Sequence, residues 1–199
     1  MTLTTLSGIA LPSNRSLVYG YGINDVFEKN FSKTVCYKKW ADLVRRCCQP
    51  RYKEKYPMYK DCTIDPTWLY ASAFKEWIET WDDYESKAID KDIKIPGNTH
   101  YSPETCLMVT QKINGWFKPT DIVGSHGDLS LPRGVSEKSG KYRAQVNIVN
   151  GPKAKHLGFF QTPEEASVVY DKARKEQILV LMEEESDPRV KNALLQYTI

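Results

Sequence analysis

The sequence has no run of about 18 or more apolar residues, the length that a membrane-spanning helix requires. Its first residues, MTLTTLSGIALPSNRS, carry no basic region ahead of the apolar ones, which argues against a secretory signal peptide. The formal net charge is only +3, so total charge alone does not mark a nucleic-acid-binding protein. These absences predict a chain with no membrane partner, and they leave its function to be sought in how charge is distributed.

Cysteine pairs with the C-x-x-C spacing are also absent. The chain has five cysteines, an odd number, and none forms the C-x-x-C spacing that usually delivers zinc ligands. Reduced, buried thiols in a cytoplasmic protein are the interpretation that this spacing favours. The alternative is that distant cysteines converge on one structural zinc ion, for which the candidates are Cys36, Cys47 (or Cys48), Cys62 and Cys106.

The chain of 199 residues with 41% hydrophobic residues is long enough for one large core or two small ones, and its pattern fits two better. We predict an N-terminal arm over residues 1–34, a first domain over 35–118, a linker over 119–129 and a second domain over 130–199. The linker is predicted from its glycine and proline residues among polar ones.

The clearest structural signal lies in residues 131–178. From Tyr142 to Ile148 apolar residues alternate with polar ones, which predicts a strand with one dry and one wet face. Val135 and its neighbours predict a short strand before it, and residues 155–160 predict a returning strand after the turn dipeptide Asn150–Gly151. A helix follows, with Thr162 as N-cap, Pro163 at its first position and Glu165 completing a capping box.

Charge divides between these layers. Residues 130–161 hold six basic residues and one acidic residue, whereas residues 162–185 hold three basic and seven acidic residues. Since a helix covers one side of a sheet, we expect the basic strand face to stay open, and such a surface suits phosphates and base edges. An ordinary solvated strand face is the alternative. The candidate contacts to a nucleic acid in this segment are Arg133, Lys138, Lys141, Arg143, Gln145, Asn147, Lys153, Lys155 and His156.

A second basic segment spans residues 29–60, with ten basic and two acidic residues. Within it, residues 34–48 show a helical apolar face that includes Trp40, which we expect in the core. The opposite side carries further candidates for phosphate contact: Lys38, Lys39, Arg45 and Arg46. Residues 67–81 predict another helix whose exposed side is acidic, and acidic faces of this kind leave a protein partner as a further alternative.

The C-terminal segment resembles the plant ethylene-response-factor (APETALA) type DNA-binding domain and its relatives in phage and homing endonucleases. The matching residues are Arg133-Gly134-Val135, Gly140-Lys141-Tyr142, Leu157-Gly158-Phe159, Glu164-Glu165-Ala166 and Ala173. The resemblance implies a three-stranded sheet that lies in the major groove, with Arg133, Gln145 and Asn147 at base-reading positions and Lys138 at a basic one. His156 stands where the family has a tryptophan, and Ser136 where it often has an arginine.

Residues 89–117 predict strand, loop, strand and helix, and they resemble phage-type HNH endonucleases. Tyr101-Ser102-Pro103-Glu104-Thr105-Cys106 is similar to a YSPENC motif, and Thr110 to Asn114 to the entry of the metal-binding helix. The resemblance, which reaches over residues 36–117, implies a helical ββα-metal domain. Together the two resemblances predict an α+β protein in which this domain precedes a three-stranded antiparallel sheet plus one helix.

The HNH resemblance implies that Asp90 and Asn114 hold Mg²⁺ or a similar divalent metal for phosphodiester cleavage. The general-base position is held by Lys91, and a lysine at its ordinary pKa of about 10.4 is protonated at neutral pH. His100, close to the loop, is the candidate substitute, and a surface role is its alternative. Two functions therefore remain open: a metal-dependent DNA endonuclease, and a non-catalytic DNA-binding or host-takeover regulatory protein on the same scaffold.

Overall fold

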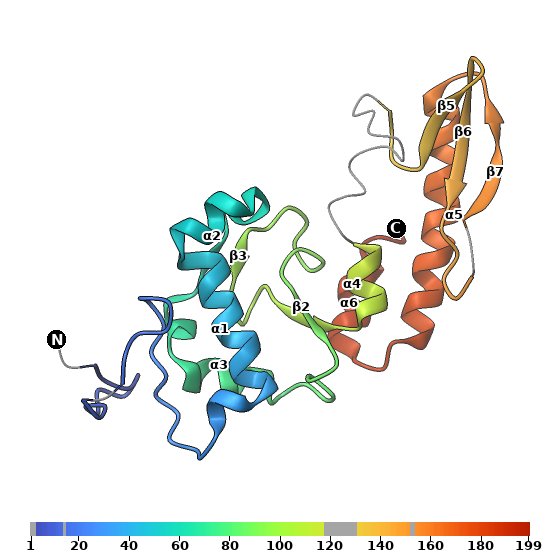
Figure 1. Ribbon diagram of the computed structural model, residues 1–199. Helices are drawn as coiled ribbons and strands as arrows, with labels where there is room; N and C mark the ends of the chain where they lie inside the picture. The colour runs from blue at the N-terminus through green and yellow to red at the C-terminus, as the bar shows by residue number, and fades with distance from the viewer. Residues whose placement is uncertain (1–2, 14, 118–130, 152–153) are drawn as a thin grey trace. The chain divides into compact units, whose positions relative to one another are not determined.

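The computed structural model describes residues 3–13, 15–117, 131–151 and 154–199. The chain divides into two compact units, Met1–Gln111 and Lys112–Ile199 (Figure 1). The linker predicted over residues 119–129 lies outside the described residues. Among the helices of the described segments, none is long and apolar enough to cross a membrane. The fold is a mixture of helices and sheets, as the sequence predicts.

The first unit is mainly helical and holds two separate two-stranded sheets. β1 pairs with β3 in parallel, and β2 pairs with β4 in antiparallel fashion. Its elements are the 3-10 helix η1 (Phe31–Lys33), α1 (Val35–Cys48), α2 (Pro50–Lys55), η2 (Pro57–Tyr59), β1 (Thr63–Ile64), η3 (Pro66–Leu69), α3 (Ala71–Ile78), β2 (Ala88–Asp90), β3 (His100–Tyr101) and β4 (Leu107–Val109).

Tryptophan side chains form the centre of the first unit's core. Trp40 on α1 and Trp68 on η3 are both fully buried, and the Trp40 indole nitrogen donates a 2.8 Å hydrogen bond to the Trp68 carbonyl oxygen. The Trp68 ring packs against Phe74 and Trp77 of α3, at centroid distances of 5.1 and 4.7 Å. The expectation that Trp40 belongs to the core is therefore confirmed.

The helix predicted over residues 67–81 is interrupted. Tyr70 has extended backbone angles and separates η3 from α3. The carbonyl of Leu69 accepts a hydrogen bond from Ile23 N, and Ala71 N donates to the Ile23 carbonyl, so the backbone on either side of Tyr70 pairs with a segment far away in sequence. The local apolar spacing does not report pairing with a segment so distant in sequence. The prediction of one continuous helix over residues 67–81 was therefore wrong.

The residues before η1 are attached to the first unit by a buried carboxylate. Asp25 accepts hydrogen bonds from the Ser72 backbone N (2.8 Å), the Ser72 hydroxyl (2.6 Å) and the Leu6 backbone N (3.3 Å). A Cβ atom at Gly22 would lie 2.9 Å from the Trp40 ring, so the chain can pass this close to the core only as glycine. The glycines of the Tyr19–Gly22 segment thus serve packing and turning.

The second unit contains the three-stranded antiparallel sheet that the sequence predicts, in the order β5-β6-β7. Its elements are α4 (Gln111–Trp116), which begins at the boundary residue, β5 (Val135–Lys138), β6 (Lys141–Val146), β7 (Lys155–Phe160), α5 (Pro163–Glu184) and α6 (Pro188–Leu195). Ser139 and Gly140 join β5 to β6 with φ angles of 53° and 72°. Two consecutive positive φ angles are what a tight hairpin turn between right-twisted strands requires.

The long helix α5 covers one face of the sheet (Figure 1). It begins as predicted, because the Thr162 hydroxyl accepts from Glu165 N while the Glu165 carboxylate accepts from Thr162 N. Ala166 and Tyr170 of α5 pack against the dry side of the sheet, and their partners in this core are Val135, Ala144 and Val146. Among the described residues of this unit, no helix packs on the opposite side of the sheet.

A glycine lets α5 approach the sheet closely. Gly134, at the start of β5, has a φ of +73°, and a Cβ atom there would lie 2.1 Å from two atoms of the Tyr170 ring. Glycine is therefore required twice, once for the backbone conformation and once for space. The Arg133-Gly134-Val135 motif thus has a structural reason at its central position.

Candidate nucleic-acid interface and the Asp90 loop

The open face of the sheet is built by strand alternation around β6. Arg143 and Gln145 alternate with the buried Ala144 and Val146, so they lie on the face that α5 does not cover. The strand register sets Ser136 opposite Arg143, Lys138 opposite Lys141, and His156 opposite Gln145. We call this surface the open sheet face; its residues are Ser136, Lys138, Lys141, Arg143, Gln145, His156 and Phe159.

Side chains on the open sheet face support one another across the strands. Arg143 is half-exposed and donates from Nε to the Ser136 hydroxyl at 3.2 Å, so Ser136 holds part of the guanidinium in place. The His156 ring lies 4.9 Å from the Phe159 ring, centroid to centroid. Phe159, opposite Arg143 in the register, is 48% exposed.

Sequence reasoning missed Phe159 as a residue of this face. Counting charges cannot find an uncharged ring, but the strand period can, because Phe160 and Phe159 are neighbours and must point to opposite faces. Phe160 packs with the core cluster, which leaves Phe159 outside. A β-bulge between Ala144 and Gln145 then changes the parity further along β7, so that Leu157 faces the core and His156 stays on the open face.

The remaining candidates for DNA contact in this unit have varied surroundings. Lys138 and Lys141 are exposed beside the tight turn, and Asn147 and Lys155 are exposed at the other end of the sheet. Lys153 lies outside the described residues. Arg133 precedes β5, and its guanidinium donates a 3.0 Å hydrogen bond to the Trp116 carbonyl, so this side chain ties the strand to the end of α4.

Most of the basic residues predicted on α1 are engaged within the first unit. Arg45 and Arg46 both form ion pairs with Asp42, three and four residues earlier on the helix. Their guanidinium groups also lie over tyrosine rings, Arg45 4.6 Å from the centroid of Tyr52 and Arg46 5.3 Å from that of Tyr59. Arg45 and Arg46, which the sequence suggests as phosphate contacts, are therefore already paired with groups of the first unit.

The two lysines of α1 differ in exposure. Lys38 is exposed, whereas Lys39 is half-buried and donates from Nζ to the Lys87 carbonyl. Burial lowers the pKa of Lys39, and the nearby charge of Arg46 acts in the same direction. For Arg46, burial alone would lower the pKa, but the charge of Asp42 and the neighbouring tyrosines outweigh it and raise the pKa. Of the four candidates on α1, Lys38 is therefore the most accessible to a polyanion.

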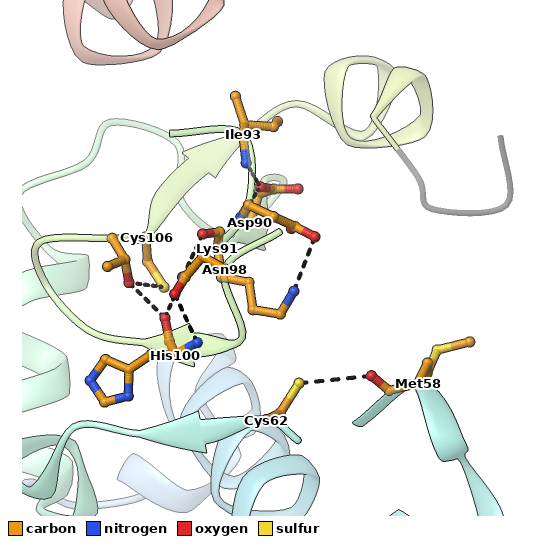
Figure 2. A network of polar contacts seen from close by, with 10 residues as sticks. Met58, Cys62, Asp90, Lys91, Ile93, Asn98, His100 and Cys106 are labelled. Atoms are coloured by element: carbon orange, nitrogen blue, oxygen red, sulfur yellow. Dashed lines mark hydrogen bonds and ion pairs between the residues drawn. The ribbon is translucent and has the colours of Figure 1, made fainter. Parts of the chain in front are cut away.

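Asp90 ends β2 and is 7% exposed. Its Oδ1 accepts hydrogen bonds from the backbone N–H groups of Asp92 (3.0 Å) and Ile93 (2.8 Å), which closes the turn after the strand (Figure 2). Burial raises the pKa of Asp90 to about 6, and the two backbone donors act against that rise. The carboxyl group is thus partly protonated at pH values near 6. One of its two oxygens, Oδ1, already accepts the two hydrogen bonds that hold the turn.

The neighbouring Lys91 is fixed by an ion pair. Its Nζ lies 3.0 Å from Asp92 Oδ2 and 5.8 Å from the centroid of the Tyr101 ring. The side chain is 14% exposed. An ammonium group held by a carboxylate in this way is a fixed positive charge close to Asp90 and has no lone pair with which to accept a proton from water.

The loop between β2 and β4 is organised by an asparagine and a threonine. Asn98 donates from its amide nitrogen to the carbonyls of Lys91 (2.8 Å) and His100 (2.7 Å), and Thr105 donates from its hydroxyl to the same His100 carbonyl at 2.7 Å. His100 Nδ1 lies 2.8 Å from the Thr63 hydroxyl on β1, and its ring points away from Asp90 (Figure 2). The structure brings Asp90 and Lys91 together, while the His100 ring is turned toward β1.

Asn114 lies on α4, the helix that directly follows the antiparallel pair β2–β4 along the chain. Asp90 belongs to the first unit and Asn114 to the second. α4 is joined to the rest of the second unit by Lys112, whose Nζ lies 2.7 Å from Asn150 Oδ1 and 2.7 Å from Glu184 Oε2. The hydrogen bond from Lys112 lowers the pKa of Glu184, and a second one from Asn150 adds to this effect.

The cysteines are free thiols, and Cys36, Cys47, Cys62 and Cys106 are buried. Burial raises the pKa of Cys36, Cys47 and Cys106 to about 12, which strongly favours the neutral thiol over the metal-binding thiolate. Within the described ranges, no three His, Cys, Asp or Glu side chains come together in an arrangement that could hold a metal ion.

Comparison with known proteins identifies no relative: no family model matches the chain, and neither the curated proteins nor the solved structures give a match.

Proposed function

We propose that the protein binds double-stranded DNA through the open sheet face. The observation that carries this proposal is the division of charge across the second unit. Lysine, arginine and amide side chains occupy the face that α5 leaves open, while α5 itself carries most of the unit's acidic residues. A duplex is a dense array of phosphates, and a surface polarised in this way attracts it by one face only.

Different residues of the open sheet face suit different parts of a duplex. Lys138 and Lys141 sit at an exposed turn, where flexible ammonium groups reach phosphate oxygens. Arg143 and Gln145 lie at the centre of the sheet, and both residue types hydrogen-bond base edges in the major groove. Phosphate contacts would fix the register of the protein on DNA, and the central residues would read sequence.

The experiment measures the affinity for a mixed-sequence duplex by fluorescence anisotropy at several salt concentrations. Each lost phosphate contact lowers the slope of log affinity against log salt by about 0.9. We expect Lys138→Ala and Lys141→Ala, which remove ammonium groups from the open sheet face, to weaken binding and to reduce the slope by about one each. Lys172→Ala, which removes an exposed charge from α5, is the matched control and should leave the slope unchanged. Unchanged affinity and slope in both sheet variants would refute the proposal.

Metal-dependent phosphodiester cleavage is a second candidate function. It is supported by the chain order of antiparallel strands β2 and β4 followed by α4, with Asp90 at the end of the first strand and Asn114 on the helix. Carboxylate and amide oxygens are ligands that Mg²⁺ accepts, with water completing its shell. The resemblance to HNH endonucleases assigns the metal-ligand roles to Asp90 and Asn114, and a bound ion would polarise the scissile phosphate. Lys91, paired with Asp92, supplies positive charge there but no proton acceptor.

Plasmid nicking in Mg²⁺ or Mn²⁺ tests this second function. Cleavage by the wild-type protein should disappear in the double variant Asp90→Ala with Asn114→Ala. It should persist in a control with exposed residues of the same kind, Asp61→Ala with Asn192→Ala. Nicking by the first double variant would put the metal elsewhere. Binding without nicking in the wild type would favour the non-catalytic regulatory protein on the same scaffold.

A further inference from the structure

Phe159 is an exposed phenyl ring in a face otherwise made of polar and charged side chains. It is 48% exposed, while its neighbour Phe160 turns inward and packs with the core. The core of the second unit therefore does not account for the ring of Phe159. Phe159 lies one residue before the end of the edge strand β7, and its exposed ring adds an apolar surface to a face of polar and charged side chains.

The surroundings of Phe159 place one apolar group beside several hydrogen-bonding groups. Arg143 stands directly opposite it on β6, and the His156 ring lies 4.9 Å away on β7. Gln145 is opposite His156. The face thus presents the Arg143 guanidinium, the Gln145 amide and the Phe159 ring close together, and the Phe159 ring packs against His156.

A duplex offers few apolar groups to a sheet in its major groove. Phosphates and sugars call for charge and hydrogen bonds, and most positions on the base edges are hydrogen-bond donors or acceptors. The exception is the methyl group on C5 of thymine, which stands next to the O4 acceptor of the same base. An apolar ring beside a guanidinium and an amide matches this pairing of a methyl group with hydrogen-bonding atoms.

We propose that Phe159 contacts the C5-methyl group of a pyrimidine in the major groove, so that the protein distinguishes methylated from unmethylated pyrimidines. Arg143 and Gln145 hydrogen-bond the neighbouring base edges, and the contact with the His156 ring holds the phenyl ring in position. This inference rests on the proposed function, since it requires the open sheet face to meet a duplex. It adds a specificity-determining residue and the chemical group which that residue reads.

The test compares two duplexes that differ only in this methyl group, one of alternating adenine and thymine and one of alternating adenine and deoxyuridine. Both carry the same phosphates and the same hydrogen-bonding groups. We expect the wild-type protein to bind the thymine duplex about fourfold more tightly for each methyl group that the ring covers, the value of one buried methyl. Phe159→Ala should bring this ratio close to one, and Phe159→Leu should keep part of it.

Val168→Ala is the matched control, because Val168 is an exposed apolar residue on α5 and is 69% exposed. This variant should keep the wild-type ratio. A wild-type ratio of one, with binding and its salt dependence intact, would overturn the role of Phe159 and leave the proposed function standing. A ratio that survives Phe159→Ala, or equal losses on both duplexes, would overturn it as well. Failure of the wild type to bind either duplex would instead contradict the proposed function.

Discussion

Replacing Gly134 by alanine separates backbone strain from steric conflict in the second unit. Gly134 has a φ of +73°, and an added Cβ would meet two atoms of the Tyr170 ring at 2.1 Å. Gly140 has almost the same φ, +72°, but an added Cβ there would have no atom within 4 Å. The two variants therefore share the conformational cost and differ only in the contact with Tyr170.

The expected magnitudes follow from this difference. An alanine forced into the left-handed region costs about 1–2 kcal/mol, which is the whole effect expected for Gly140→Ala. For Gly134→Ala, overpacking against the Tyr170 ring adds about 1–3 kcal/mol. Combining Gly134→Ala with Tyr170→Leu should recover part of that addition, because the leucine leaves room where the ring stood.

Hydrogen-exchange mass spectrometry on peptides that cover β6 and α5 measures these free energies locally, so unfolding of the first unit does not enter. We expect faster exchange in Gly134→Ala than in Gly140→Ala, and a smaller loss of protection in the double variant than the sum of the single ones. Equal effects of the two glycine variants would refute the close packing of Tyr170 on the start of β5.

Three further predictions concern single groups. The folded-state pKa of Asp90 is raised from 3.8 to about 6, so the first unit should lose up to about 3 kcal/mol of stability as pH rises from about 4 to about 6. Urea titrations at several pH values measure this dependence, and Asp90→Asn should remove it. A pH dependence that is unchanged in Asp90→Asn would contradict the prediction. Cys36, Cys47 and Cys106 should resist a thiol reagent at neutral pH until the protein unfolds, whereas rapid native labelling of all five cysteines would show that they are not buried as described. Thr162→Ala should destabilise α5 by about 1 kcal/mol, as measured by hydrogen exchange, whereas Thr162→Ser should not, because serine keeps the capping oxygen. Equal losses of stability in the two variants would exclude the capping box.

The second unit could be predicted well because its signals are local. Alternation in residues 142–146 fixed which side chains share a face, and the Thr162–Glu165 capping box fixed where α5 begins. The short hairpin at Ser139–Gly140 needs nothing beyond its own two residues. Strands this short are still defined by sequence when turn chemistry and apolar period agree.

What the sequence could not provide depends on contacts between distant residues. The break at Tyr70 comes from pairing with Ile23, 47 residues earlier in the chain. The raised pKa of Asp90 comes from burial, which no motif reports. Arg45 and Arg46 counted as free positive charge, although Asp42 stands three and four residues before them, a spacing at which helical ion pairs form.

Hydroxyl-radical footprinting of the protein with and without a mixed-sequence duplex tests the central claim most directly, because it reports which side chains DNA covers. The account predicts that DNA protects Phe159 and His156 on the open sheet face and leaves Val168 and Leu179 on α5 as reactive as before. Protection of Val168 and Leu179 with unchanged reactivity of Phe159 and His156 would contradict it.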